Sequence, residues 1–132
     1  MSGAAIAFQT ALVAALAAHP PLADALAGIF DGPPPRSPYP YLAIGPIAAS
    51  DWSHKSGRGR ELRLTLSLWD DGATPARLHG LLAEAERAID ALPRDLGGHD
   101  LVSLAFLGSR VLRDPAGPWA GILDYRARTL EQ

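Results

Sequence analysis

The chain of 132 residues contains no cysteine, a single lysine and no apolar run long enough to cross a membrane. The absence of cysteine excludes disulfide bonds and thiol chemistry. The four histidines stand far apart, at positions 19, 54, 79 and 99, so we expect no metal site and no cofactor. A formal net charge of −2 argues against a general nucleic-acid-binding protein but leaves room for a local basic patch.

The N-terminal segment lacks the features of an export signal or a membrane anchor. It has no positively charged start, and Gln9 and Thr10 interrupt its apolar residues. Pro20 and Pro21 follow too soon for a membrane span. We therefore expect a protein made in the cytoplasm, without membrane contact. A mass of 13.9 kDa predicts a single domain, 1–132, large enough to bury a core without disulfides or a metal.

The stretch from Ser50 to Asp70 organises the rest of the chain. Its second half alternates between four leucines and the set Arg63, Thr65, Ser67 and Trp69. This period of two predicts a strand with one apolar and one mixed face. Its first half is rich in Ser, Gly and basic residues and predicts a projecting loop. A strand at 41–44 is expected to pair with 62–69 across this loop.

Two helical segments begin the chain, and a longer helix follows the central strand. Apolar residues at helical spacing predict a helix over 4–18 and a short one over 22–26. Thr74 and Pro75 are typical of an N-cap followed by the first helical position. The apolar stripe of the next helix consists of Leu78, Leu81, Leu82, Ala85, Ala88, Ile89 and Leu92.

The remaining segments complete an α+β pattern. Ile29 and Phe30 can begin a short strand, 47–52 a further one, and 101–113 and 119–130 predict a C-terminal hairpin. The predicted fold is an antiparallel four-stranded sheet of two hairpins, packed against one long helix, with an N-terminal helix. The five prolines in 31–41 indicate either a rigid connector or, alternatively, a proline-rich recognition ligand.

A search for catalytic residues yields only weak candidates. Asp51, Ser53 and His54 have the residue types of a hydrolase triad, but all three stand in one loop, whereas a triad draws its members from separate segments. Asp70 and Asp71 precede a helix, where negative charge is favoured, so capping explains them. We therefore expect no catalytic residues and a protein that is not an enzyme.

The local excess of positive charge lies in the loop, and three tryptophans are candidate contact residues. The basic tip is either a solvated loop or a surface that faces a partner or DNA; it consists of His54, Lys55, Arg58 and Arg60. Trp52 and Trp119 suit a core or an interface equally. Trp69 falls on the mixed face of its strand, which favours a subunit interface.

Several of these segments, in this order, resemble the small tail-completion or tail-terminator proteins of siphophage-like particles and gene transfer agents. The similar stretches cover nearly the whole chain. They are Leu12-Val-Ala-Ala-Leu-Ala-Ala-His-Pro-Pro-Leu with Ile29-Phe-Asp, Tyr39-Pro-Tyr-Leu-Ala-Ile-Gly, Asp51-Trp-Ser-His-Lys-Ser-Gly with Leu64-Thr-Leu-Ser-Leu-Trp, and Ser109-Arg-Val-Leu-Arg-Asp-Pro-Ala-Gly with Gly121-Ile-Leu-Asp-Tyr-Arg-Ala-Arg.

The resemblance implies a structural protein of the particle neck, assembled in the bacterial cytoplasm. Such proteins form a hexameric ring that ends the tail tube and joins it to the head-tail connector or stopper. The expected partners are further copies of the chain, the tail tube protein and the connector, while DNA passes through the lumen without specific binding. We expect the loop from Ser53 to Arg60 to reach an adjacent subunit or the tube, and Trp69 and the C-terminal hairpin to contribute ring contacts.

Two alternatives stay open. The chain could be a connector or stopper nearer the portal, which would bind the head-side adaptor instead of the tube protein. It could also be a small cytoplasmic enzyme or ligand-binding domain, which would require a pocket with convergent polar groups.

Overall fold

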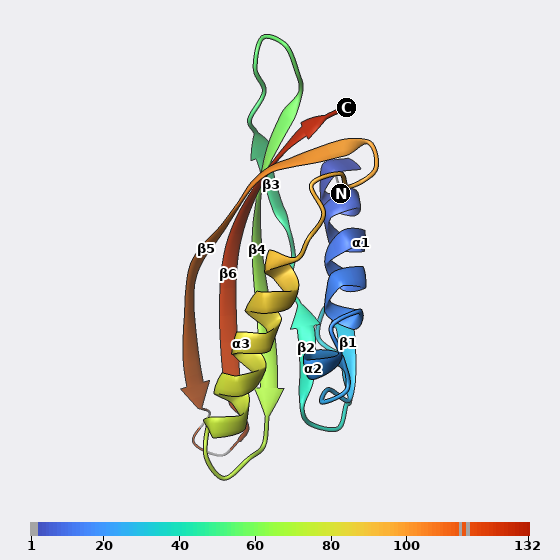
Figure 1. The fold of residues 1–132 in the computed structure, drawn as a ribbon. Coiled ribbons are helices and arrows are strands. Elements are labelled where there is room, and N and C mark those ends of the chain that lie inside the picture. The colour runs from blue at the N-terminus through green and yellow to red at the C-terminus, as the bar shows by residue number, and fades with distance from the viewer. Residues whose placement is uncertain (1–2, 114, 116) are drawn as a thin grey trace.

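The computed structural model describes residues 3–113, 115 and 117–132, and this part of the chain forms three helices and six strands (Figure 1). In chain order they are α1 (Gly3–Ala17), α2 (Pro20–Ala23), β1 (Gly28–Asp31), β2 (Tyr41–Ile44), β3 (Ala48–Asp51), β4 (Gly59–Asp70), α3 (Ala76–Asp90), β5 (His99–Arg113) and β6 (Trp119–Glu131). The prediction of an α+β fold is confirmed.

The strands form one mixed sheet of six, with the order β1-β2-β4-β6-β5 and with β3 beside the first half of β4. The predicted four-stranded antiparallel sheet is therefore wrong in detail. The short strand at β1 joins the sheet and runs parallel to β2. In addition, β2 and β3 pair with different halves of β4, because Gly45 and Pro46 interrupt the edge between them.

The central strand forms as its pattern predicts. Leu62, Leu64, Leu66 and Leu68 are buried on one face of β4. β2 pairs with Leu66–Trp69, which confirms the expected pairing of 41–44, while β3 pairs with Arg60–Arg63. Figure 1 shows the β3–β4 hairpin extending beyond the helices at one end of the molecule.

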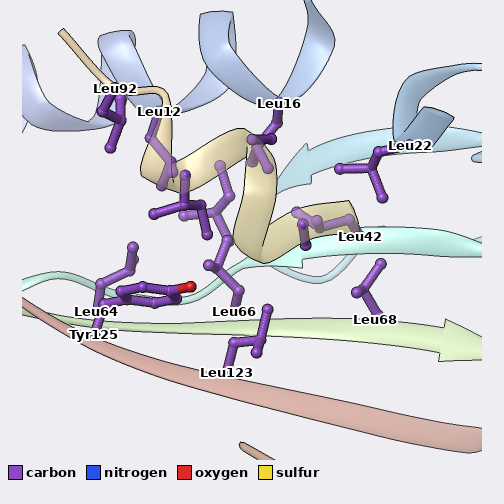
Figure 2. Close-up of a cluster of buried hydrophobic side chains, with 14 of the residues drawn as sticks. Leu12, Leu16, Leu22, Leu42, Leu64, Leu66, Leu68, Leu92, Leu123 and Tyr125 are labelled. Atoms are coloured by element: carbon purple, nitrogen blue, oxygen red, sulfur yellow. The ribbon is translucent and has the colours of Figure 1, made fainter. Parts of the chain in front are cut away.

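One face of the sheet is covered by two helices of 15 residues each, not by one long helix. The alanine-rich α1 contributes Phe8, Leu12 and Leu16, which are fully buried. Figure 2 shows leucines from α1, α2, β2 and β4 meeting the ring of Tyr125 from β6 in one cluster. The apolar stripe predicted for α3 lies in the same core.

The opposite face carries no helix, and its side chains change in character along the strands. At one end, the row that crosses β2, β4, β6 and β5 is Tyr41, Trp69, Ala120 and Leu112. At the other end, near the β3–β4 hairpin, the face is charged and contains Glu61, Arg63, Arg126 and Arg128. This helix-free face thus has an aromatic end and a charged end.

Two helix starts differ from the prediction. α2 begins at Pro20 and not at Leu22. The first N–H groups of a helix have no partner within the helix, so a proline, which lacks an N–H, is tolerated at these positions. α3 begins at Ala76 with Pro75 at the N-cap position, one residue later than predicted, and the hydroxyl of Thr74 accepts a hydrogen bond from the N–H of Ala76 at 3.4 Å. The predicted role of Asp70 as a capping carboxylate is wrong as well: Asp70 pairs with the side chain of Arg77.

Candidate functional site

The loop between β3 and β4 closes by a tight turn. The N–H of His54 donates to the carbonyl of Gly57 at 2.8 Å, and the N–H of Trp52 donates to the carbonyl of Gly59 at 2.9 Å. Strand β4 begins at Gly59, so the predicted loop of Ser53–Arg60 is shorter than expected and Arg60 lies in the sheet. The tip is therefore narrow and held by backbone hydrogen bonds.

The three residue types of a hydrolase triad are adjacent here but are not arranged as one. The hydroxyl of Ser53 donates to Oδ1 of Asp51 at 2.7 Å and accepts from the N–H of Gly59 at 3.1 Å. The bond from Ser53 holds the pKa of Asp51 below its usual value. The ring of His54 packs edge-on against Trp52, with 4.5 Å between centroids. These contacts hold the loop together, and among the described residues no hydrogen bond joins Ser53 to the imidazole of His54, as a triad requires.

The four basic residues predicted for the tip are exposed to different degrees, and His54 is among the exposed ones. Lys55 and Arg58 are exposed, whereas Arg60 is partly covered and lies 3.3 Å from the carboxylate of Asp51. Arg58 and Arg60 line a hollow of about 250 Å³ with His99 of β5 and the first residues of α1. Glu131 also lines this hollow, so the hollow contains charges of both signs.

Trp52 and Trp69 lie toward opposite ends of the helix-free face. The guanidinium of Arg128 stands 5.4 Å above the ring of Trp52 and is itself bonded to Glu61 at 3.1 Å. Trp69 stacks on Tyr41 with 6.3 Å between centroids, and its indole N–H donates to Ser67 at 3.0 Å.

Trp69 belongs to a cluster that we call the aromatic patch, formed by Phe30, Tyr39, Tyr41 and Trp69. All four rings retain solvent exposure. Beside the patch is a hollow of about 260 Å³ whose walls are mostly apolar; it is lined by Pro33, Tyr41, Ala43, Ile44, Gly45, Ser67 and Trp69. Partly exposed aromatic rings around an apolar hollow are typical of protein contact surfaces.

Trp119 is placed differently from the other two tryptophans. It packs against the core on the helix-covered side, where its indole N–H donates to the carbonyl of Gly72 at 3.0 Å. The guanidinium of Arg113 lies 4.7 Å from its ring. Much of this side chain is therefore engaged within the chain, and its role in a subunit contact stays a prediction.

The sequence interpretation missed the exposed apolar residues of β5. Val102, Phe106, Leu107 and Leu112 are each between 43% and 51% exposed. Apolar pairs at 101–102 and 106–107 break the period of two expected of a strand. The register of β5 against β6 shifts at the second residue of each pair, Val102 and Leu107, so the pairs were the sequence signal for these two exposed side chains.

The described residues include neither a metal-binding cluster nor a membrane-spanning helix. No group of three or more His, Cys, Asp or Glu side chains gathers there in a way that could hold a metal ion. None of the described helices has the length and apolar character needed to span a membrane.

Comparison with known proteins gives consistent results. The family described as tail completion protein gp17 matches residues 10–130. The tail completion protein gp17 of Bacillus phage SPP1 is 25% identical over 111 residues, which are 84% of this chain and 82% of that protein. The solved structure of SPP1 gp17 aligns with a TM-score of 0.66 at 24% identity, covering 96% of this chain and 91% of the other.

A second solved structure extends the similarity to an assembled particle. A chain in the virion of a native gene transfer agent particle aligns with a TM-score of 0.74 and 28% identity, covering 98% of this chain and 99% of that one. Sequence and fold therefore agree along almost the whole length, and the chain belongs to the tail completion protein gp17 family of phage and gene transfer agent particles.

Proposed function

We propose that this protein forms a ring at the head-proximal end of a tail tube, where it stops tube growth and offers a surface to the head-tail connector. The observation that carries the proposal is the alignment with a chain of a gene transfer agent virion over 98% of this sequence. Family membership supports a structural role in the tail. We propose no catalytic activity, and the hydrogen bonds of Ser53 support this.

The shape of the sheet suits a ring. Its two sides differ: β1 and β3 lie on one side, and β5 lies on the other. A contact that joins two different surfaces of identical chains repeats from copy to copy. The copies form a closed ring when the rotation between neighbours adds up to a full turn. The resemblance described above implies closure at six copies.

The β3–β4 tip and the aromatic patch are our candidates for contacts outside the fold. Lys55 and Arg58 are exposed at the projecting tip and can reach a neighbouring copy or the tube. Trp69, in the aromatic patch, is suited to a drier contact because its ring is already partly desolvated by Tyr41.

Deletion of the gene tests the proposal. Particles from the deletion strain, viewed by negative-stain electron microscopy, should show overlong or unjoined tails beside separate filled heads, and the wild-type gene on a plasmid should restore normal particles. Normal tail length and titre without the gene would contradict the proposal. Purified protein should capture the tail tube protein, whereas capture of the head-side adaptor alone would indicate a stopper.

A further inference from the structure

The outer edge of β5 is open along most of its length. Its first residues are covered by the preceding segment, where the N–H of Leu101 donates to Arg94 at 2.7 Å and the N–H of Leu96 donates to His99 at 2.8 Å. From residue 103 to 113 no described strand lies beside this edge. An open edge of this length is a site for pairing with another chain unless something covers it.

This edge is also apolar. Phe106 is 47% exposed, Leu107 44% and Leu112 51%. The register shift between Phe106 and Gly108 leaves Leu107 without a partner on β6, so it forms a bulge. Exposed apolar side chains on a free edge make a monomer prone to aggregation. Burial of the edge in an assembly removes this tendency.

The opposite side of the sheet is interrupted at the same level as this bulge. The N–H of Gly45 donates to the carbonyl of Thr65 in β4 at 2.8 Å. Thr65 pairs with Asp124 of β6, which in turn pairs with Gly108 of β5, so these residues lie in one row across the sheet. The break between β2 and β3, which contains Pro46, is therefore level with the bulge. Figure 1 shows β5 and the β1–β2 pair at opposite sides of the sheet.

Strand direction and charge are complementary as well. β5 runs parallel to β4 and β1 runs antiparallel to it, so two copies side by side in one orientation bring β5 and β1 together as an antiparallel pair. Asp31 of β1 lies on the row of Ile44, Leu66, Leu123 and Ser109. Within the described residues Asp31 has no ion pair. Arg110 follows Ser109 on β5 and lies 3.3 Å from Asp124 of its own chain, but its side chain is 58% exposed, so its guanidinium can also face Asp31 of a neighbouring copy.

We infer that the free edge of β5 docks on the β1–β2–β3 side of a second copy, with the Leu107 bulge entering the break at Gly45–Ile47 of that copy. The sheet then continues from subunit to subunit. This inference rests on the proposed ring and names its subunit contact.

The absence of native cysteine allows a direct crosslinking test. Two double variants, Asp31→Cys with Ser109→Cys and Pro46→Cys with Leu107→Cys, are each supplied to the deletion strain. Assembled particles are purified and oxidised, and the protein is examined by immunoblot after non-reducing electrophoresis. Both pairs should yield a ladder of covalent multimers that ends at the ring size. Each pair tests the contact independently, so misfolding of one variant leaves the other decisive.

Single variants and a mismatched pair serve as controls. Each single cysteine should stay monomeric, and so should Val13→Cys with Ser109→Cys, because Val13 is exposed on α1, outside the proposed contact. A dimer from Leu107→Cys alone would mean that β5 pairs with β5, and this would overturn the inference. Normal particles without a ladder from either pair would also overturn it, while overlong tails in the deletion strain would still support the terminator function. A ladder in a strain whose deletion leaves tails normal would support the contact and contradict that function.

Discussion

The carboxylate of Asp70 is fully buried at the end of β4 and is bonded to the guanidinium of Arg77 in the first turn of α3. Nε of Arg77 donates to Oδ2 of Asp70 at 3.0 Å, and the backbone N–H of Asp71 donates to Oδ1 at 3.0 Å. A buried carboxylate is costly unless its oxygens are bonded, so this pair fixes the connection between the sheet and the helix that covers it.

Replacing Arg77 with Ala should lower the melting temperature clearly, because Asp70 then stays buried without its cationic partner. Arg63→Ala is the matched control: Arg63 is 56% exposed, against 54% for Arg77, but its distance to Glu61 is 3.8 Å and it serves no buried group. Thermal unfolding followed by circular dichroism measures both. Equal melting temperatures for the two variants would contradict the role given to the Asp70–Arg77 pair.

The hydroxyl of Tyr125 is buried in the core and has no hydrogen-bond partner among the described residues. Burial raises the pKa of Tyr125 above its usual range, with Glu86 and Asp90 adding to the effect. An unpaired buried hydroxyl costs about 1–3 kcal/mol, whereas the ring itself fills the cluster in Figure 2. Tyr125→Phe should therefore keep the free energy of unfolding or raise it by about 1 kcal/mol.

Chemical denaturation with urea tests this expectation. Tyr41→Phe is the control, since the Tyr41 ring lies on the helix-free face and keeps part of its solvent contact. A loss of stability in Tyr125→Phe, without a similar loss in Tyr41→Phe, would mean that the Tyr125 hydroxyl is bonded in solution.

The fold was predictable where one local pattern decided the structure. The alternation of Leu62 to Leu68 gave the central strand, and the apolar stripe gave α3. The parallel pairing of β1 could not be predicted, because four residues with partial burial carry no signal about their neighbour. The aromatic patch was also beyond local reasoning, since Phe30, Tyr41 and Trp69 meet only through that pairing and the register of β2 with β4.

Gly59 stands where the β3–β4 hairpin narrows, and no side chain fits there. A Cβ at this position would lie 2.2 Å from the carbonyl oxygen of Trp52 and 3.0 Å from that of Thr129. Both contacts are with backbone, so Gly59→Ala must move a strand and should destabilise the protein by about 1–3 kcal/mol. Gly57→Ala is the control, because its Cβ would meet only Leu130, at 3.9 Å. Comparable urea midpoints for the two variants would argue against this close approach.

Glu84 of α3 bonds to His19, which lies between α1 and α2, and this link is lost at low pH. Nε2 of His19 lies 2.7 Å from its carboxylate, and the bond from His19, followed by the charge of Arg87, holds the pKa of Glu84 below its ordinary value of 4.5. The native state thus binds the Glu84 proton less readily than the unfolded state does. The stability from this group is present above about pH 4.5 and is lost as the pH falls through the lowered pKa.

Glu84→Gln removes the ionisable group and should flatten this part of the pH profile. Melting temperatures measured between pH 6 and pH 3 should fall less steeply in Glu84→Gln than in the wild type, with a residual slope from Asp51 and Asp95, whose pKa values are also lowered. Glu86→Gln, a neighbour on the same helix, is the control. If the melting temperature of Glu84→Gln falls with pH as steeply as that of the wild type, the His19–Glu84 bond does not contribute to the pH dependence of stability.

Removal of the two arginines at the tip should affect assembly and leave folding unchanged. Arg58 is exposed, and Arg60 makes a partly exposed ion pair with Asp51 at 3.3 Å and donates to the carbonyl of Gly59 at 3.1 Å; exposed contacts of this kind add little to stability. The double variant Arg58→Ala with Arg60→Ala should therefore melt like the wild type but lower the yield of joined, infectious or gene-transferring particles. The control is the double variant Arg63→Ala with Arg87→Ala, which removes the same charge from two exposed positions outside the tip and outside the β5 edge, and it shows whether any loss is specific to the tip. A lowered melting temperature in the tip variant would mean that these arginines stabilise the fold. A normal particle yield would mean that the tip makes no contact needed for assembly.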